Sequence, residues 1–444
     1  MTKTAYPLSP DRLETKFSDK YPPYDLGEAL AESNRCLYCF DAPCVHACPT
    51  SIDIPTFIKK IASGNVRGSA KTILSANLLG ESCARVCPVE VLCEGDCVYT
   101  TWGRTPISIG RLQRYATENG ARYVELERKH ATGKSIGLVG AGPASLACAG
   151  RLALLGHEAV IYEKGTLPGG LNTTGVAPYK MPADEVLHEV EFIGSLGVKI
   201  ETGVEVGKDI SADELLEKHD AVFLGPGLGE DSQMDALARD TAGVLGAVEW
   251  IRRMKTDPKM SLDSVRHAAV IGGGNTALDA ARELAQLGVE HVRLVYRRSE
   301  AEMRGYGHEW TQAKKEGVVL VPNAIVKEVV SQNGTVNSLA LVRARNGKPT
   351  DHELDEIRTD LVIVAIGQAR LLELVNMFPG VECDGRGHIV ADEETGVTGN
   401  PLIFAAGDAC NGGKEVVNAV AEGQRAATAI DAMLMGSDSG GKNA

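Results

Sequence analysis

Residues 135–163 read SIGLVGAGPASLACAGRLALLGHEAVIYE, and this stretch decides the fold. An apolar strand over 135–139 runs into a glycine-rich turn, a helix follows to about residue 155, and a second strand over 158–162 ends at an acid. Strand, glycine-rich turn, helix, strand and acid in this order are typical of a dinucleotide-binding βαβ unit. The sequence therefore predicts a Rossmann-like α/β domain around this stretch.

The residues of this turn fit such a unit one by one. Gly140 is expected to make the tight turn, and Gly142 to let backbone N–H groups reach a pyrophosphate at the helix N-terminus. Glu163 would accept hydrogen bonds from ribose hydroxyls. Ser145 replaces the third glycine of the fingerprint and is still small enough for close helix packing. The predicted contacts are Gly140, Gly142, Pro143, Ala144, Ser145 and Glu163.

A second unit of the same kind begins with an apolar strand over 267–271, and its last strand, 291–296, ends in two arginines. Arginine at this place accommodates the 2′-phosphate of NADP, whereas an acid selects the free hydroxyl of NAD. We therefore expect NADP(H), with a third arginine close enough in sequence to join the site. The alternative is that the arginine pair is a solvated surface feature. The predicted contacts are Gly272, Gly273, Gly274, Asn275, Thr276, Arg297, Arg298 and Arg304.

Two further apolar strands, 221–224 and 361–365, end in glycine-containing turns and are expected to close the two units. The second of these turns contains Ala365, Ile366 and Gly367. A last apolar strand then leads into Gly407-Asp408 and a long helix over 416–435. This arrangement is typical of flavoproteins with two dinucleotide domains, in which the acid bonds the ribityl chain of the flavin. We therefore expect an FAD domain that is split in sequence by an inserted NAD(P) domain.

Eight of the 11 cysteines fall between Cys36 and Cys97. A disulfide framework would suit a small secreted domain, and this chain shows no export signal. Thiols strung at short gaps, with proline after a cysteine, favour [4Fe-4S] ligation over zinc, which usually takes two tight pairs. Zinc and unliganded thiols remain as alternatives. The groups are Cys36-x2-Cys39-x4-Cys44-x3-Cys48-Pro49 and Cys83-x3-Cys87-Pro88-x4-Cys93-x3-Cys97.

Two clusters with ligands exchanged between the groups fit this pattern, as in two-cluster ferredoxins. Eight thiolates would be enough for two cubanes. Between the groups, Ile54, Phe57, Ile58 and Ile61 recur at helical spacing, which predicts helices that separate the clusters. The N-terminal domain is therefore expected to be α-helical.

Composition narrows the possible partners. The chain has 444 residues, with 46 Lys and Arg against 59 Asp and Glu and a net charge of −13, so nucleic acid is not expected as a partner. No apolar run is long enough to span a bilayer, and the polar start lacks a signal pattern. We expect no membrane association and a cytoplasmic location.

The expected domains follow in order. They are a helical iron–sulfur domain over 1–130, the first part of the FAD domain over 131–260, the NAD(P) domain over 261–368 and the second part of the FAD domain over 369–444. These segments account for the chain.

This layout resembles the small subunit of bacterial glutamate synthase and the N-terminal half of dihydropyrimidine dehydrogenase, over nearly the whole chain. It resembles above all the reductase (PreT-type) subunits of bacterial dihydropyrimidine dehydrogenase, through residues 83–88, the Gly110–Tyr115 stretch and residues 365–368. The resemblance places Gly169, Gly170, Leu171 and Lys180 around the flavin, although Lys180 stands where the family usually has Arg. Some bacterial subunits of the family use NADH, so both NADP(H) and NAD(H) stay open.

The resemblance also implies the cluster ligands. Cys36, Cys39, Cys44 and Cys97 would hold one cluster, and Cys48, Cys87, Cys93 and Gln113 the other, because these dehydrogenases use a glutamine of this motif as an oxygen ligand. Cys83 would then be free. By ligand chemistry alone, Cys83 is the better soft ligand, so the choice between Cys83 and Gln113 stays open.

The resemblance implies that the chain passes electrons from NAD(P)H through FAD and two [4Fe-4S] clusters to a PreA-like catalytic subunit. That subunit would contain FMN and iron–sulfur clusters, and would reduce uracil and thymine to 5,6-dihydropyrimidines. The alternative in the same class is the small subunit of NADPH-dependent glutamate synthase. An alternative in another class is a redox-responsive binding protein that uses its clusters as sensors.

Overall fold

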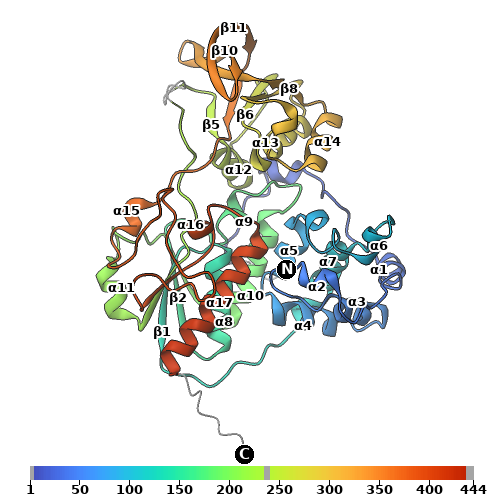
Figure 1. Ribbon diagram of the computed structural model, residues 1–444, viewed down its shortest axis with the longest axis vertical. Helices are drawn as coiled ribbons and strands as arrows, with labels where there is room; N and C mark the ends of the chain where they lie inside the picture. Colours follow the sequence, from blue (N-terminus) through green and yellow to red (C-terminus); the bar gives the residue numbers. More distant parts are fainter. Residues whose placement is uncertain (1–4, 235–240, 437–444) are drawn as a thin grey trace, which may run out of the picture.

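The computed structural model describes residues 5–234 and 241–436. Figure 1 shows three parts: a helical domain at the right in blue, one α/β unit at the lower left and a second at the top. The lower unit contains both green segments from mid-chain and the red C-terminal helix, whereas the upper unit is built from yellow and orange segments between them. Among the described residues, no helix is long and apolar enough to cross a membrane.

The helical domain is organised around α3 (Ile54–Ala62) and α7 (Ile109–Gly120). The Asp53 carboxylate accepts a hydrogen bond from the Thr56 N–H, which caps the start of α3. Four apolar residues bury one face of α3, as their spacing predicted: Ile54, Phe57, Ile58 and Ile61. The other helices of this domain are α1 (Leu26–Ser33), α2 (Pro43–His46), α4 (Val66–Ala76), α5 (Gly80–Val86), η2 (Val89–Val91), α6 (Val98–Thr101) and η3 (Ala121–Tyr123). The short helix η1 (Leu13–Lys16) comes before them and packs against the second α/β unit.

The first α/β unit has a parallel sheet in the order β13-β4-β1-β2-β3. Its strands are β1 (Ser135–Val139), β2 (Glu158–Glu163), β3 (Lys199–Thr202), β4 (Ala221–Leu224) and β13 (Ile403–Ala405). Because β13 pairs with β4, the C-terminal segment returns to the sheet that the first fingerprint begins. The domain is therefore split in sequence, as expected.

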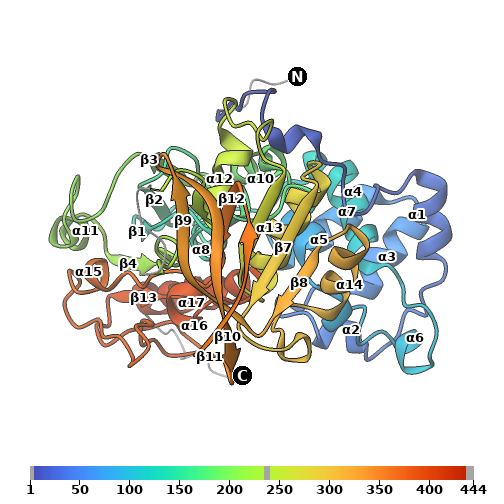
Figure 2. The same ribbon diagram turned by 90° about the horizontal axis from the view of Figure 1, so that it is seen from above.

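Helices cover this sheet on both sides. On one face, α8 (Pro143–Leu154) packs against the long α17 (Val416–Met435), and the two lie side by side in Figures 1 and 2. Small residues such as Ala147 and Ala426 fill that contact and are fully buried. The remaining helices are α9 (Leu171–Thr174), α10 (Ala183–Ser195), α11 (Ala212–Lys218), α15 (Leu372–Val375) and α16 (Asp408–Asn411).

The second α/β unit has its own parallel sheet, in the order β5-β12-β6-β7-β8. The strands are β5 (Val244–Gly246), β6 (His267–Ile271), β7 (His291–Tyr296), β8 (Val319–Pro322) and β12 (Leu361–Val364), and the helices are α12 (Ala247–Thr256), α13 (Asn275–Gln286), η4 (Glu300–Glu302) and α14 (Gly307–Lys315). Strand β5 pairs with β12, and Trp250 of α12 is buried in this unit's core. These elements therefore join the second unit ahead of residue 261, where the sequence alone suggested a boundary.

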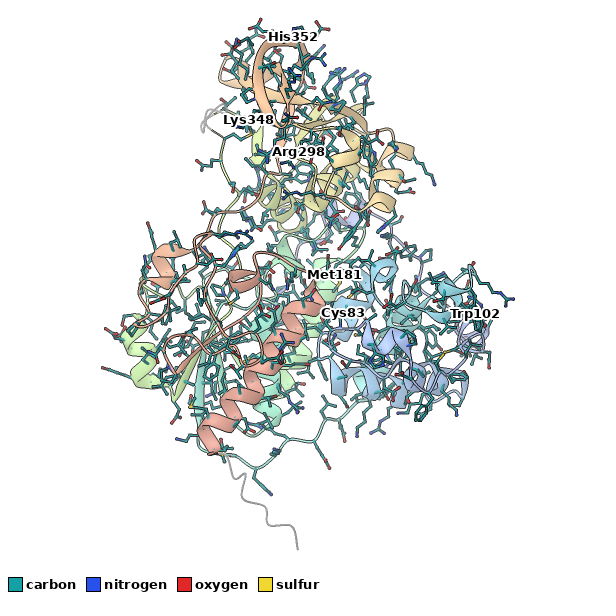
Figure 3. The ribbon with its side chains drawn as sticks, in the orientation of Figure 1. Cys83, Trp102, Met181, Arg298, Lys348 and His352 are labelled. Carbon is teal, nitrogen blue, oxygen red and sulfur yellow. The ribbon has the colours of Figure 1, made fainter. Side chains whose placement is uncertain are left out.

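A three-stranded antiparallel sheet, in the order β11-β10-β9, projects from the second unit. Its strands are β9 (Ala324–Gln332), β10 (Thr335–Arg345) and β11 (Lys348–Arg358), joined by short turns. Figure 3 shows Lys348 and His352 in this sheet, at the top of the molecule. This sheet lies within 261–368, the range expected for the NAD(P) domain as a whole.

The segment before Cys36 contacts all three parts of the molecule. Leu13 and Phe17 pack into the core of the second α/β unit. The Arg12 guanidinium pairs with Asp184 of the first unit at 2.6 Å, and Asp19 pairs with Arg114 of the helical domain at 2.6 Å. Residues 12–20 therefore connect the three parts of the molecule, and this segment is called the N-terminal strap below.

Candidate functional site

A cavity of about 1000 Å³ lies where the three parts meet. Both dinucleotide units contribute to its walls, together with α5 of the helical domain. The residues predicted as cofactor contacts that line it are Gly140, Gly142, Pro143, Ala144, Glu163, Gly170, Leu171, Lys180, Asn275, Thr276, Ile366, Gly367, Gly407 and Asp408. Tertiary structure thus brings most of the predicted contacts of both units to one site.

The first fingerprint has the geometry of a phosphate-binding turn. Gly140 adopts φ +83°, and a Cβ there would lie 2.8 Å from the Gly225 carbonyl oxygen. Gly142 caps the start of α8, and within the described residues no atom lies within 4 Å of a Cβ built on it. Its Cα therefore faces the open cavity, where backbone can approach a phosphate closely.

Besides the expected contact with ribose hydroxyls, Glu163 accepts hydrogen bonds from backbone N–H groups near the turn. Its Oε2 accepts a hydrogen bond from the Ala141 N–H at 2.8 Å, and its Oε1 accepts one from the Gly165 N–H at 2.7 Å. Each carboxylate oxygen can accept a further hydrogen bond. Glu163 thus fixes the turn and still has lone pairs for ribose hydroxyls.

The C-terminal part of the first unit completes this side of the cavity. Gly407 adopts φ +76°, and its N–H donates to Glu422 Oε2 at 2.8 Å. Burial raises the pKa of Asp408, which accepts a hydrogen bond from the Lys414 N–H. Gly169 also has positive φ and lies just outside the lining, while Ser145 is buried against Gly225. A half-buried acid beside two glycine-rich turns suits the polar ribityl and phosphate groups of a flavin dinucleotide.

Two residues of the second fingerprint, Asn275 and Thr276, line the same cavity from the other unit, whereas its three glycines are outside the lining. A Cβ on Gly272 would clash with the Ala365 carbonyl, whereas Gly274 is open in the described part of the chain. The Asn275 Oδ1 accepts a hydrogen bond from the Tyr306 N–H at 2.9 Å. Gly273 packs on Tyr296 at the end of β7. A phosphate can therefore approach the backbone at Gly274 as closely as it can at Gly142 in the first turn.

The three predicted arginines stand apart from the shared cavity. Arg297 and Arg298 follow β7 and lie against the turn between β10 and β11, since a Cβ on Gly347 would be 3.4 Å from Arg298 Nε. Figure 3 shows Arg298 in the upper unit, well away from Cys83 at the junction. The Arg304 N–H donates to the Gly273 carbonyl at 3.1 Å, beside the second fingerprint. A dinucleotide that begins at these arginines would extend towards the shared cavity.

Lys180 bridges the two units. Its Nζ pairs with Asp279 at 2.7 Å and with Glu309 at 3.2 Å, and both carboxylates belong to the second unit. Burial lowers the pKa of Lys180, but these carboxylates outweigh burial and the pKa is raised. Lys20, from the N-terminal strap, also pairs with Glu309 at 2.8 Å.

Sequence reasoning missed Lys20, Asp279 and Glu309, which all line the cavity. Asp279 follows Asn275 by one helical turn on α13, so both face the same side, and this spacing was an available signal. Nothing local in the sequence pointed to Lys20 or Glu309, because they meet only through the packing of distant segments.

The fold exchanges Cys48 and Cys97 between the two sequence groups, and the names first and second group refer from here on to the groups in space. The first group lines a small apolar cavity of about 30 Å³: Cys36, Cys39, Cys44 and Cys97. Burial, together with the neighbouring thiols of Cys36, Cys97 and Cys39, raises the pKa of Cys44 to about 12. The walls include Ile54, Ile58 and Ile107. These four are the cysteines that the family resemblance assigned to one cluster.

The second group contains Cys48, Cys83, Cys87 and Cys93. A hydrogen bond with Cys83 raises the pKa of Cys87, as do burial and the charges of Cys93 and Cys48. The Cys83 Sγ accepts a hydrogen bond from Asn77 Nδ2 at 3.2 Å. Gln113 lies on α7, and its Nε2 donates to the Gly80 carbonyl at 2.7 Å, which leaves its amide oxygen for a ligand.

Both groups fit iron–sulfur clusters. Buried thiols that repel one another stay protonated unless a cation binds them, and cluster ligation supplies that charge. Among the described residues, no three thiol, imidazole or carboxylate groups converge on one point that could hold a single ion. Thiolates on separate corners of a cubane lie farther apart than the ligands of one zinc ion.

Comparisons with known proteins agree with this site. Residues 13–124 match the family described as dihydropyrimidine dehydrogenase domain II, 4Fe-4S cluster, and residues 134–423 match pyridine nucleotide-disulphide oxidoreductase. The glutamate synthase [NADPH] small chain of Escherichia coli is 33% identical over 96% of this chain and 95% of its own length. The NAD-dependent dihydropyrimidine dehydrogenase subunit PreT of Salmonella typhimurium is 34% identical over 90% of this chain and 93% of its own.

The fold also has solved counterparts. The structure of T. acidophilum thioredoxin reductase covers 68% of this chain with a TM-score of 0.54 at 20% identity, and 99% of that chain is matched. The fold and the site thus define an NAD(P)H-dependent oxidoreductase with FAD and two [4Fe-4S] clusters. The chain belongs to the pyridine nucleotide-disulphide oxidoreductase family, and it is similar to PreT and to the glutamate synthase small chain over nine-tenths or more of its length.

Proposed function

We propose that the chain is the electron-input subunit of an NAD(P)H-dependent dihydropyrimidine dehydrogenase. The observation that carries this is the single cavity lined by both dinucleotide turns and by Cys87 of the second thiol group. A donor nucleotide, a flavin and a cluster could therefore occupy adjacent positions in one path. FAD bound there would take a hydride from NAD(P)H and release electrons singly to the clusters.

The protein's own residues bind and orient these groups. Gly140, Gly142 and the N-terminus of α8 would hold the FAD pyrophosphate, with Glu163 on a ribose and Asp408 on the ribityl chain. Further contacts would come from Pro143, Ala144, Ser145, Gly169, Gly170, Leu171 and Gly407. Lys180 would hold the two dinucleotide units at a fixed separation through Asp279 and Glu309, which lie at 2.7 and 3.2 Å.

The second unit would hold the donor. Its turn residues, Gly272, Gly273, Gly274, Asn275 and Thr276, would bind the nucleotide phosphates, and Ala365, Ile366 and Gly367 would border the nicotinamide. Arg297 and Arg298, with Arg304 nearby, favour a 2′-phosphate and hence NADPH over NADH. The preference is tested by comparing flavin bleaching with the two nucleotides.

The clusters would be held as the family resemblance implies. Cys36, Cys39, Cys44 and Cys97 would bind one, and Cys48, Cys87 and Cys93 the other, with Gln113 as its fourth ligand. Cys87 lines the flavin cavity, so the second cluster would receive electrons first. The first cluster, in the small cavity beside α2 and α6, would pass them on to a partner protein.

The partner would be a PreA-like subunit with FMN and its own clusters, which reduces uracil and thymine. Mixing the purified chain with that subunit under anaerobic conditions should give NAD(P)H oxidation that depends on uracil. NAD(P)H oxidation at the same rate with and without uracil would contradict the proposal.

The alternative is a glutamate synthase small chain, which the 33% identity over 96% of the chain supports to a similar degree. It predicts that the protein co-purifies with a large subunit that has glutaminase activity. Purification from the native cell, followed by assays for both activities, separates the two assignments.

A further inference from the structure

Helix α5 is the structural link between the cavity and the second thiol group. It spans Gly80–Val86 and carries Cys83, and Cys87 follows directly. Residues 84–87 line the large cavity. Any shift of α5 therefore changes the separation between the flavin position and the cluster position at once.

A buried carboxylate of the FAD domain holds the start of this helix. Glu189 lies on α10, and its Oε1 accepts hydrogen bonds from the N–H groups of Glu81 at 2.9 Å and Ser82 at 3.2 Å. Its Oε2 accepts a short hydrogen bond from the Ser82 hydroxyl. That hydroxyl also accepts one from Asn172 Nδ2 at 3.1 Å, and Asn172 lines the cavity.

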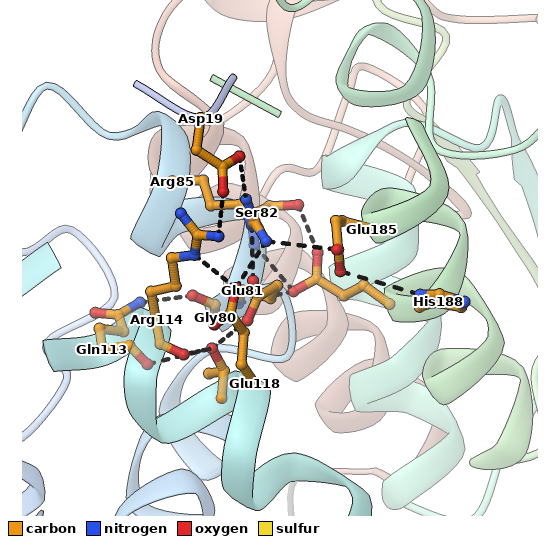
Figure 4. Close-up of polar contacts among 12 residues, drawn as sticks. Asp19, Gly80, Glu81, Ser82, Arg85, Gln113, Arg114, Glu118, Glu185 and His188 are labelled. Carbon is orange, nitrogen blue, oxygen red and sulfur yellow. Dashed lines mark hydrogen bonds and ion pairs between the residues drawn. The ribbon is translucent and has the colours of Figure 1, made fainter. Parts of the chain in front are cut away.

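Neighbouring contacts orient the rest of α5, as Figure 4 shows. The Arg85 guanidinium pairs with Glu118 of α7 at 2.8 Å and with Glu185 of α10 at 3.5 Å. The Gly80 carbonyl accepts a hydrogen bond from Gln113 Nε2 at 2.7 Å. Contacts with the helical domain on one side and with the FAD domain on the other thus hold α5 in place.

Burial of the Glu189 carboxyl group costs free energy of folding. The residue is 6% exposed, and burial raises the pKa of its carboxyl to about 8, against the hydrogen bonds from Ser82 that lower it. A buried carboxyl is tolerated only when hydrogen bonds satisfy it, and those bonds then fix its partners in one geometry. An apolar residue here could pack the interface but could not fix α5 by its backbone.

We propose that Glu189 is a positioning residue for electron transfer, which docks α5 on the FAD domain and so sets the distance from the flavin to the second cluster. The inference rests on the proposed function only in that electrons pass from flavin to cluster inside this chain. In that step the flavin reduced by NAD(P)H loses one electron at a time. Each electron reduces a cluster, and the flavin proton goes to solvent.

The test compares Glu189→Ala, Glu189→Gln and Ser82→Ala in the cofactor-loaded chain, with Glu201→Ala as the matched control. Glu201 is an exposed carboxylate on β3 of the same domain. Anaerobic stopped-flow absorbance follows flavin reduction and cluster reduction separately, and hydrogen exchange follows the Glu81 and Ser82 amides with and without cofactors.

We expect flavin reduction by NAD(P)H to stay within about twofold in all variants. Cluster reduction should slow measurably in Glu189→Ala and not in Glu201→Ala, because the rate of electron transfer falls as the flavin and cluster positions move apart. Glu189→Gln keeps an acceptor for both amides, so its rate of cluster reduction should stay close to that of the wild type. The rate in Ser82→Ala should lie between those of Glu189→Ala and Glu189→Gln. The two amides should exchange faster in Glu189→Ala.

Normal cluster reduction in Glu189→Ala would overturn the inference, and so would unchanged exchange of the two amides. These results are distinct from failure of the proposed function. In that case the wild-type clusters would not be reduced by NAD(P)H, or would be reduced without supporting uracil reduction by the partner.

Discussion

Replacement of Gly423 by alanine should weaken both the fold and FAD binding. Gly423 lies in α17 where this helix crosses the first turn of α8, and a Cβ there would clash with the Ala144 carbonyl oxygen. It would also lie 3.0 Å from the Ala144 carbonyl carbon and 3.2 Å from its Cα. Ordinary carbon contacts are ~3.5–4.0 Å, and the Ala144 carbonyl oxygen lies nearer still, so the two helices would have to separate by roughly one ångström.

The magnitude follows from two opposed terms. Alanine gains about 1 kcal/mol over glycine inside a helix, whereas overpacking against rigid backbone costs about 1–3 kcal/mol. We expect a net loss of up to roughly 2 kcal/mol, which lowers the Tm of the apoprotein by up to about 8 °C for a domain of this size. Because Ala144 belongs to the turn that lines the cavity, FAD affinity should fall by about tenfold for each 1.4 kcal/mol lost there.

Thermal unfolding of the apoprotein and FAD titration by flavin fluorescence measure these effects. The matched control is Gly194→Ala in α10, where the described residues place no atom within 4 Å of the new Cβ. That variant should gain up to about 1 kcal/mol of stability and keep its FAD affinity. If Gly423→Ala behaved like Gly194→Ala in both assays, the close approach of α17 to the cofactor turn would be refuted.

Three other variants test the remaining assignments. Gln113→Leu should lose the second cluster and bring iron from about eight to about four per chain, while Cys83→Ser keeps both clusters; iron analysis and EPR decide, and the reverse result would make Cys83 the ligand. Arg298→Ala should raise the KM for NADPH by about tenfold or more and leave that for NADH unchanged, since a charge-assisted contact is worth about 1.5–3 kcal/mol; an equal effect on both nucleotides would make Arg298 a surface residue. Burial raises the pKa of Glu283 from 4.5 to about 8, so stability due to its neutral form should be complete below pH 4.5 and lost as pH rises towards 8; Glu283→Gln should remove that part of the pH dependence in urea titrations, and parallel pH profiles would contradict it.

Local sequence was enough to place the elements that bind dinucleotides. The strands expected over 135–139, 221–224 and 267–271 are β1, β4 and β6 with the same bounds. Apolar strands, glycine turns and caps act through contacts between near neighbours in the chain, which a sequence pattern records directly. The split of the first α/β unit was also predicted, because an apolar strand that ends in Gly407-Asp408 before a long helix is typical of the last part of an FAD domain.

Other parts of the molecule depended on pairing between distant segments. Strand β5 is three residues long, from Val244 to Gly246, and its register is set by β12 rather than by its own pattern. The N-terminal strap looked like a polar tail because its partners, among them Asp184 and Glu309, come from other domains. A short segment bound to distant partners carries little local signal of its place.

The sequence by itself determined which chemistry this protein can hold: two dinucleotide turns, eight clustered thiols and the order of the domains. Only the tertiary structure decided which thiols lie together, that Lys180 bridges to Asp279 and Glu309, and that Glu189 meets α5. The division has a physical reason. Turns and strands follow from short-range sterics and periodicity, whereas the separation of buried groups in different domains is set by close packing across interfaces, which no local pattern encodes.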